Sequence, residues 1–151
     1  MTILYAMLIL HIITGLIGVM SAFSMLIGFL RRVPKIGALK GWSLVSAISF
    51  ILSWISGAYY YVLYYGGNVK PIILKSAYPW AHQIVMEAKE HVFLFIPLVS
   101  IVVSIGIFLA GEDILNDKPI KKSLAWLTAF VFILGVVISL AGVGISGAVR
   151  G

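Results

Sequence analysis

Cysteine is absent from this chain of 151 residues, and charged residues make up only 11% of it. The absence of cysteine excludes disulfides, thiolate metal ligands and cysteine nucleophiles. The sequence also lacks the GxSxG, HExxH and glycine-rich phosphate-binding motifs that mark several classes of soluble enzyme. What remains is strongly apolar, because 62% of the residues are hydrophobic, compared with roughly 45–50% in soluble domains.

The hydrophobic residues are gathered into long runs. A helix needs about 20 apolar residues to cross the hydrocarbon core of a bilayer, and four runs are long enough, at about residues 2–30, 42–65, 81–110 and 123–149. The first run is followed by two arginines, where a signal peptide would have a cleavage site of small residues, so we expect it to be retained. We therefore predict an all-α fold, in which residues 1–151 form a single four-helix up-down bundle in the lipid bilayer.

The net charge of +6 comes mainly from the connections between these runs. Segment 31–40 contains four lysines and arginines and segment 118–122 contains three, whereas the connection on the other side of the bundle contains only Lys70 and Lys75. By the positive-inside rule, this distribution places both termini outside. We interpret the charge as a topology signal and predict no nucleic-acid partner. The expected location is a prokaryotic cytoplasmic membrane, with both termini extracytoplasmic.

Two of the three histidines are predicted to lie at the same depth in the membrane. His11 precedes the end of the first run by 19 residues, and His91 precedes the end of the third run by 19 residues. At about 1.5 Å per residue, both would lie about 28 Å from the inner boundary of a core roughly 30 Å thick. The first and third helices are diagonal in an up-down bundle, so the two imidazoles could face each other. We expect His82 to lie among the headgroups, pointing away from His91.

Small residues surround this level of the bundle. The fourth run contains a stripe at helical spacing, formed by Gly135, Ser139, Gly142 and Ser146. Gly15 and Gly18 follow His11 in the first run. Stripes of this kind allow membrane helices to pack closely, and they also leave room for a bulky planar ligand. Both interpretations remain open, and Gly142 lies at the level of the histidines, where the ligand interpretation is stronger.

The stretch WAHQIVMEAKEHVFLF, residues 80–95, carries charge into the third run. Glu87 and His91 are four residues apart and share a helical face. Ionisable residues within membrane helices usually face the bundle interior or a water-filled cavity. We therefore predict that Glu87 and His91 face the interior, and that Pro97 kinks the helix and turns His91 toward the bundle axis. The alternative is an interfacial first turn after Pro79, where carboxylates suit the positive end of a helix.

Level histidines on diagonal helices are typical of the axial ligands of a low-spin haem. The leading hypothesis is therefore one non-covalent haem b held by His11 and His91, since covalent attachment would require a CxxCH motif. With Gly15 and Gly18 below His11, and Pro97 after His91, the chain resembles small four-helix membrane cytochromes of the b type. The resemblance implies electron transfer, either as a quinol-linked oxidoreductase or as an electron-transfer subunit. Three histidines cannot hold a second bis-histidine haem.

This hypothesis assigns roles to several further residues. The haem propionates would point to the aqueous edge, where the nearby polar side chains are Tyr60, Tyr64, Lys70 and Lys75. Glu87 would be the catalytic group, either by hydrogen-bonding an axial imidazole or by accepting a proton from a quinol. Room for the cofactor would come from Gly15, Gly18 and Gly142.

Two other functions remain open. His11 and His91, with Glu87 and Glu90 as alternative ligands, offer the mixed nitrogen and oxygen donors that bind a single transition-metal ion. The chain would otherwise be an accessory subunit without a cofactor, whose small-residue faces assemble with other membrane subunits or with a second copy. Transport is less consistent with the sequence, because there is no evident inverted repeat.

Overall fold

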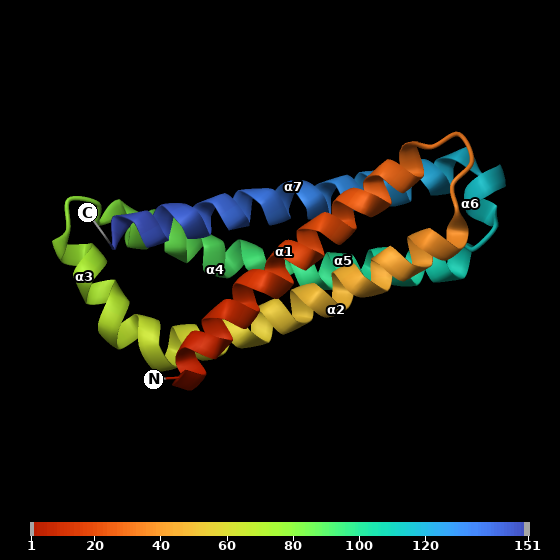
Figure 1. The fold of residues 1–151 in the computed structure, drawn as a ribbon. Coiled ribbons are helices and arrows are strands. Elements are labelled where there is room, and N and C mark those ends of the chain that lie inside the picture. Colours follow the sequence, from red (N-terminus) through yellow and green to blue (C-terminus); the bar gives the residue numbers. More distant parts are fainter. Residues whose placement is uncertain (1, 150–151) are drawn as a thin grey trace.

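The computed structural model describes residues 2–149, which contain helices and short connections and no strand. The elements, shown in Figure 1, are α1 (Thr2–Leu30), α2 (Ile36–Tyr60), η1 (Tyr61–Val69), α3 (Lys70–Lys75), η2 (Ala81–Met86), α4 (Glu87–Phe93), α5 (Phe95–Ala110), α6 (Asp113–Asn116) and α7 (Lys118–Ala148). The segments η1 and η2 are π-helical. The predicted all-α fold is confirmed.

Four helical segments are long and apolar enough to cross a membrane, at residues 2–30, 36–75, 81–110 and 118–148. The second and fourth begin before their apolar runs, and the second also continues past its run, to Lys75. Hydropathy marks where the lipid-facing part of a helix stops, whereas the helix itself continues as long as its backbone hydrogen bonds do. At the start of α7, for example, the carboxylate of Asp117 accepts a hydrogen bond from the backbone N–H of Ile120 at 3.0 Å.

The packing order is that of an up-down bundle. Helix α1 packs against α2 and α7, and α5 packs against the same two helices. As expected, α1 and α5 therefore lie on a diagonal. Figure 1 shows α1 crossing obliquely, from the far end of α2 to the beginning of α7.

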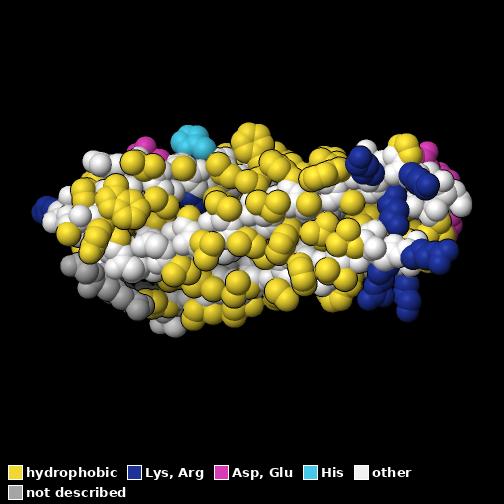
Figure 2. All heavy atoms as spheres, turned by 90° about the horizontal axis from the view of Figure 1, so that it is seen from above, with side chains coloured by type: hydrophobic (Ala, Val, Ile, Leu, Met, Phe, Trp, Pro, Cys, Tyr) yellow, Lys and Arg dark blue, Asp and Glu magenta, His cyan; other side chains and the backbone are white. Residues whose placement is uncertain are grey.

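The two ends of the bundle differ in charge. We call one the basic end, because arginines and lysines gather there, as Figure 2 shows; they are Arg31, Arg32, Lys35, Lys40, Lys118, Lys121 and Lys122. We call the other the terminal end, because α1 begins there and α7 ends there (Figure 1). Between the two ends the flank is covered with exposed hydrophobic side chains on every long helix. This surface suits lipid, so the chain is an integral membrane protein.

Toward the basic end the helices are tightly packed. The Ser43 and Ser104 hydroxyls lie 3.1 Å apart, and Ser100 donates to the Ser46 hydroxyl at 3.1 Å, so two hydrogen bonds join α2 to α5. The buried apolar core of this half includes Met25, Phe29, Leu39, Phe50, Val103, Ile107 and Val131. This half therefore combines hydrogen bonds between buried serines with a buried apolar core.

Toward the terminal end the second helical segment bends away from α1. It continues without a break from α2 through η1 into α3, which curves across to the side of η2 (Figure 1). The third segment is interrupted at Leu94, between α4 and α5. Pro97 follows three residues later, and a proline removes the hydrogen bond to the carbonyl four residues before it, here that of Phe93. This interruption agrees with the predicted kink.

Candidate functional site

A cavity of about 630 Å³ lies in the terminal half of the bundle. Helix α1, the α2–η1 segment, α4 and the end of α7 enclose it. Its walls are rich in aromatic rings, which belong to Tyr5, Trp54, Tyr60, Tyr61, Tyr64, Tyr65 and Phe93. Tyr5 and Trp54 are also 55% and 41% exposed, so the cavity reaches the flank of the bundle. Its volume falls within the range of roughly 300–1,000 Å³ that is typical of small-molecule sites.

Three side chains that can carry charge line this cavity, namely His11 from α1 and Lys89 and Glu90 from α4. The Oε1 atom of Glu90 is buried and has no hydrogen-bond partner within residues 2–149. The Lys89 ammonium lies opposite Gly142 on α7, where an added Cβ atom would be 3.6 Å from Nζ. A membrane protein rarely keeps such groups without a functional reason, because each is costly in a low-dielectric environment.

The imidazole of His11 is held against α2. Its Nδ1 atom lies 2.8 Å from the carbonyl oxygen of Ser53, and the Ser53 hydroxyl donates to the His11 carbonyl at 2.9 Å. A carbonyl oxygen can only accept, so Nδ1 carries the proton in this contact and Nε2 of the neutral ring carries the lone pair. The close approach requires Gly57, because a Cβ atom there would lie 2.6 Å from Nδ1. Helix α2 therefore fixes both the tautomer and the position of the ring.

Tyr65 connects the cavity to a buried histidine. Its ring lines the cavity, and its hydroxyl lies 3.1 Å from Nδ1 of His82. His82 is only 2% exposed, and its Nε2 atom is buried with no partner within residues 2–149. We expected an interfacial side chain among the headgroups, but the structure buries the His82 ring within the protein. The curve of η1 and α3 brings Tyr65 over η2, and this long-range contact buries the imidazole.

Glu87 and His91 lie on the outside of the bundle. Both are exposed, neither lines the cavity, and Nδ1 of His91 bonds to the Glu87 carbonyl of its own helix at 2.7 Å. Figure 2 shows histidine and acidic atoms on the otherwise apolar flank. The prediction that this pair faces the interior was wrong, although the two residues do share a face. The cavity is lined instead by Lys89, Glu90 and Phe93 of α4, together with Met86 at the end of η2.

The residues of the cavity do not fit a bis-histidine haem. His11 borders the cavity and His91 lies outside it, so the two imidazoles do not face each other across a common space. The alternative metal ligands are divided in the same way, since Glu90 lines the cavity and Glu87 does not. Within residues 2–149, no group of three or more histidine, aspartate or glutamate side chains is placed to hold a metal ion.

The remaining predicted site residues fall into two groups. Tyr60, Tyr64 and Gly142 line the cavity. Gly15 and Gly18 do not, because Cβ atoms there would lie 3.2 Å from the Ser53 hydroxyl and 2.8 Å from the Phe50 ring, so these glycines serve helix packing.

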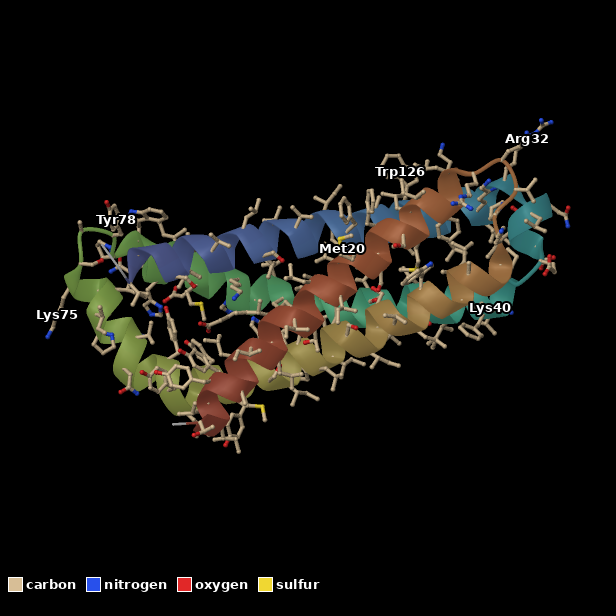
Figure 3. The ribbon with its side chains drawn as sticks, viewed as in Figure 1. Met20, Arg32, Lys40, Lys75, Tyr78 and Trp126 are labelled. Carbon is tan, nitrogen blue, oxygen red and sulfur yellow. The ribbon has the colours of Figure 1, made fainter. Side chains whose placement is uncertain are left out.

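The two lysines predicted to meet propionates also lie outside the cavity lining. Lys75 is exposed at the tip of the terminal end, as Figure 3 shows, and Lys70 begins α3. The bend of η1 and α3 carries both lysines away from the level of His11.

The sequence interpretation missed Lys89 and Tyr65, as well as Trp54. The spacing of the tyrosines in residues 59–65 was a usable signal for part of this wall, because several rings in one helical segment must cover neighbouring surface. Comparisons of the chain with protein-family models, with curated proteins and with solved structures gave no match.

Proposed function

We propose that this protein binds a quinol in the cavity of the terminal half and serves membrane electron transfer as a quinol-binding subunit. The observation that carries this proposal is the Oε1 atom of the half-buried Glu90, which is buried and has no hydrogen-bond partner within residues 2–149, although the Tyr61 hydroxyl lies close to the same carboxylate. The cavity around it is otherwise lined mainly by aromatic rings. A buried acceptor left unpaired costs about 1–3 kcal/mol. A ligand with a hydroxyl group on a flat ring would remove that cost.

The shape and position of the cavity favour an amphipathic aromatic ligand. Aromatic side chains provide flat apolar surfaces against which a ring packs favourably. The exposed rings of Tyr5 and Trp54 mark an edge on the flank, through which a hydrophobic tail would extend into lipid. Glu90 precedes the end of α5 by 20 residues, or about 30 Å along the helix axis. The head group would therefore lie near one face of the hydrocarbon core.

The polar side chains would orient the head group. His11 presents its Nε2 lone pair from α1, and Glu90 presents a carboxylate from α4. Lys89 adds a cation, which stabilises negative charge on a neighbouring oxygen atom. A simple phospholipid acyl chain would fill the volume but would supply no donor for Glu90 Oε1.

Binding can be measured through Trp54, which lines the cavity. A short-chain quinol or quinone added to the purified protein in detergent should quench its fluorescence saturably, and Trp54→Phe should remove most of that signal. Trp126→Phe is the matched control, because Trp126 is an exposed residue of α7 toward the basic end (Figure 3). The absence of saturable quenching by either ligand form would contradict the proposal.

An absorption spectrum of the isolated protein separates this proposal from the haem hypothesis. The proposal predicts a protein without haem absorption that still binds quinol. A sharp reduced α-band that disappears in His11→Ala would instead show that His11 ligates haem in the cavity.

A further inference from the structure

We infer that the cavity selects the reduced, dihydroxy form of its ligand over the oxidised dione, an inference that rests on the proposed quinol-binding function. The basis is the set of hydrogen-bonding roles available on the cavity wall. A quinol oxygen can both donate and accept, whereas a quinone oxygen can only accept. The preferred form is therefore determined by the number of wall groups that require a donor.

Glu90 is the first group that requires a donor. An ionised carboxylate has only acceptor sites, and Oε1 of this residue is buried without a partner in the described chain. Lys89, the preceding residue, also lines the cavity. A quinol hydroxyl would pair with Oε1, and a quinone oxygen would instead place two acceptors against each other.

His11 is the second such group. The contact between Nδ1 and the Ser53 carbonyl commits the proton of the neutral ring to that nitrogen, so Nε2 can only accept. The tautomer is not free to change, because the alternative would place two lone pairs 2.8 Å apart. Gly57 allows the ring to remain at this position. The wall of α1 therefore presents a fixed acceptor.

The two acceptors lie on neighbouring parts of the cavity wall. The His11 ring packs edge-on against Phe93, with the ring centroids 6.0 Å apart. Glu90 precedes Phe93 by three residues on α4, which is about 4.5 Å along the helix axis. Both acceptors therefore lie beside Phe93 on the cavity wall.

Lys89 does not reverse the preference. Its ammonium group donates to any ligand oxygen, and a quinol oxygen accepts that bond while its hydroxyl proton remains available to Glu90 or His11. The tyrosine hydroxyls can each donate or accept, and the Tyr61 hydroxyl lies close to the Glu90 carboxylate, but Oε1 of that carboxylate still has no hydrogen-bond partner within residues 2–149. The fixed roles of the wall are therefore two acceptors and one donor, which a quinol satisfies fully. A quinone satisfies only the donor.

The test compares three ligands that share one ring. They are a short-chain quinol kept reduced without oxygen, the corresponding quinone, and the dimethyl ether of the quinol, which retains both oxygens but has no hydroxyl protons. Titration calorimetry in detergent reports each affinity directly. We expect the quinol to bind roughly tenfold to a hundredfold more tightly than the other two, because they leave buried acceptors unpaired.

Variants of α4 identify the acceptor. Glu90→Gln keeps the shape of the side chain but adds an amide donor, so it should reduce the ratio of quinol to quinone affinity several-fold while binding of the quinone persists. Glu87→Gln is the matched control, because this residue is an exposed glutamate on the same helix that lies outside the cavity lining. Its ratio should equal that of the unmodified protein.

The possible outcomes are distinct. If quinol and quinone bind with equal affinity, or if Glu90→Gln leaves the ratio unchanged, the inference is overturned while quinone-type binding stands. If none of the three ligands binds, the proposed function itself fails. The comparison of ligands on the unmodified protein does not depend on the folding of any variant.

Discussion

The two halves of the bundle use the same residue types with opposite results. Toward the basic end, Cβ atoms at Gly18, Gly106 and Gly135 would lie within 2.7–2.8 Å of Phe50, Leu124 and Val19, although Gly37 and Gly41 at the start of α2 have no neighbour within 4 Å. Toward the terminal end, Gly144 and Gly147 have no such neighbour within 4 Å, and Gly142 borders the cavity. Small residues permit close packing of helices, but whether it occurs depends on the side chains of the facing helix.

The side chains that face the small residues differ in size and charge between the two halves. In the basic half, serines on α2 and α5 hydrogen-bond across the interface and bring the two backbones together. In the terminal half, the second segment carries tyrosines, and α4 directs Lys89 and Glu90 inward. Charged groups are costly to bury in a dry close-packed interface of this kind. The helices therefore remain apart around a cavity.

We expect the largest loss of stability when a side chain is enlarged in the tightly packed half. Gly18→Leu should destabilise the fold by about 1–3 kcal/mol or more, because its side chain would overlap the Phe50 ring. Gly144→Leu adds the same volume where no neighbour lies within 4 Å, and should change stability little. Thermal unfolding in detergent measures both variants. Equal melting temperatures for the two would show that the halves are packed alike.

The same added volume should affect ligand binding in the terminal half. Gly142→Leu would project into the cavity toward Lys89, so quinol affinity should fall at least about tenfold. Its melting temperature should stay close to that of the unmodified protein, because an added Cβ atom meets only ordinary van der Waals contact there. Fluorescence titration and thermal unfolding separate the two effects. Unchanged affinity would exclude this part of the cavity as the binding site.

A smaller effect is expected where α2 supports the histidine. Gly57→Ala would place a methyl group 2.6 Å from Nδ1 of His11 and force the ring away from Ser53, so quinol affinity should fall several-fold. The double variant Gly57→Ala with His11→Ala removes the clash. The losses of quinol-binding free energy caused by the two single substitutions should therefore not add up in the double variant. Strict additivity would mean that the glycine acts independently of the ring.

The smallest effects are expected on the outer face of α4. His91→Ala should leave both ligand affinity and stability nearly unchanged, within about 0.5 kcal/mol, because the ring is exposed and bonds only to its own helix. Calorimetric titration and thermal unfolding test this expectation. A loss of ligand binding in His91→Ala would show that the two faces of α4 are assigned the wrong way round.

The site was predicted from the sequence only in part. His11, Tyr60, Tyr64 and Gly142 were singled out, and all four line the cavity. Glu90 appeared only as an alternative metal ligand. The choice between Glu87 and Glu90 failed because helical spacing states which residues share a face, while both faces of α4 carry an ionisable pair. Nothing in that spacing says which pair points inward.

The sequence by itself determined the class of the protein, the four membrane helices, their up-down order and the interruption before Pro97. These features follow from hydrophobic length and from the chemistry of single residues, which are local properties. Only the tertiary structure decided the rotation of α4, the burial of His82 beneath Tyr65 and the separation of His11 from His91. The burial of His82, for example, depends on how η1 brings Tyr65 over η2. Such contacts join residues that are far apart in the sequence.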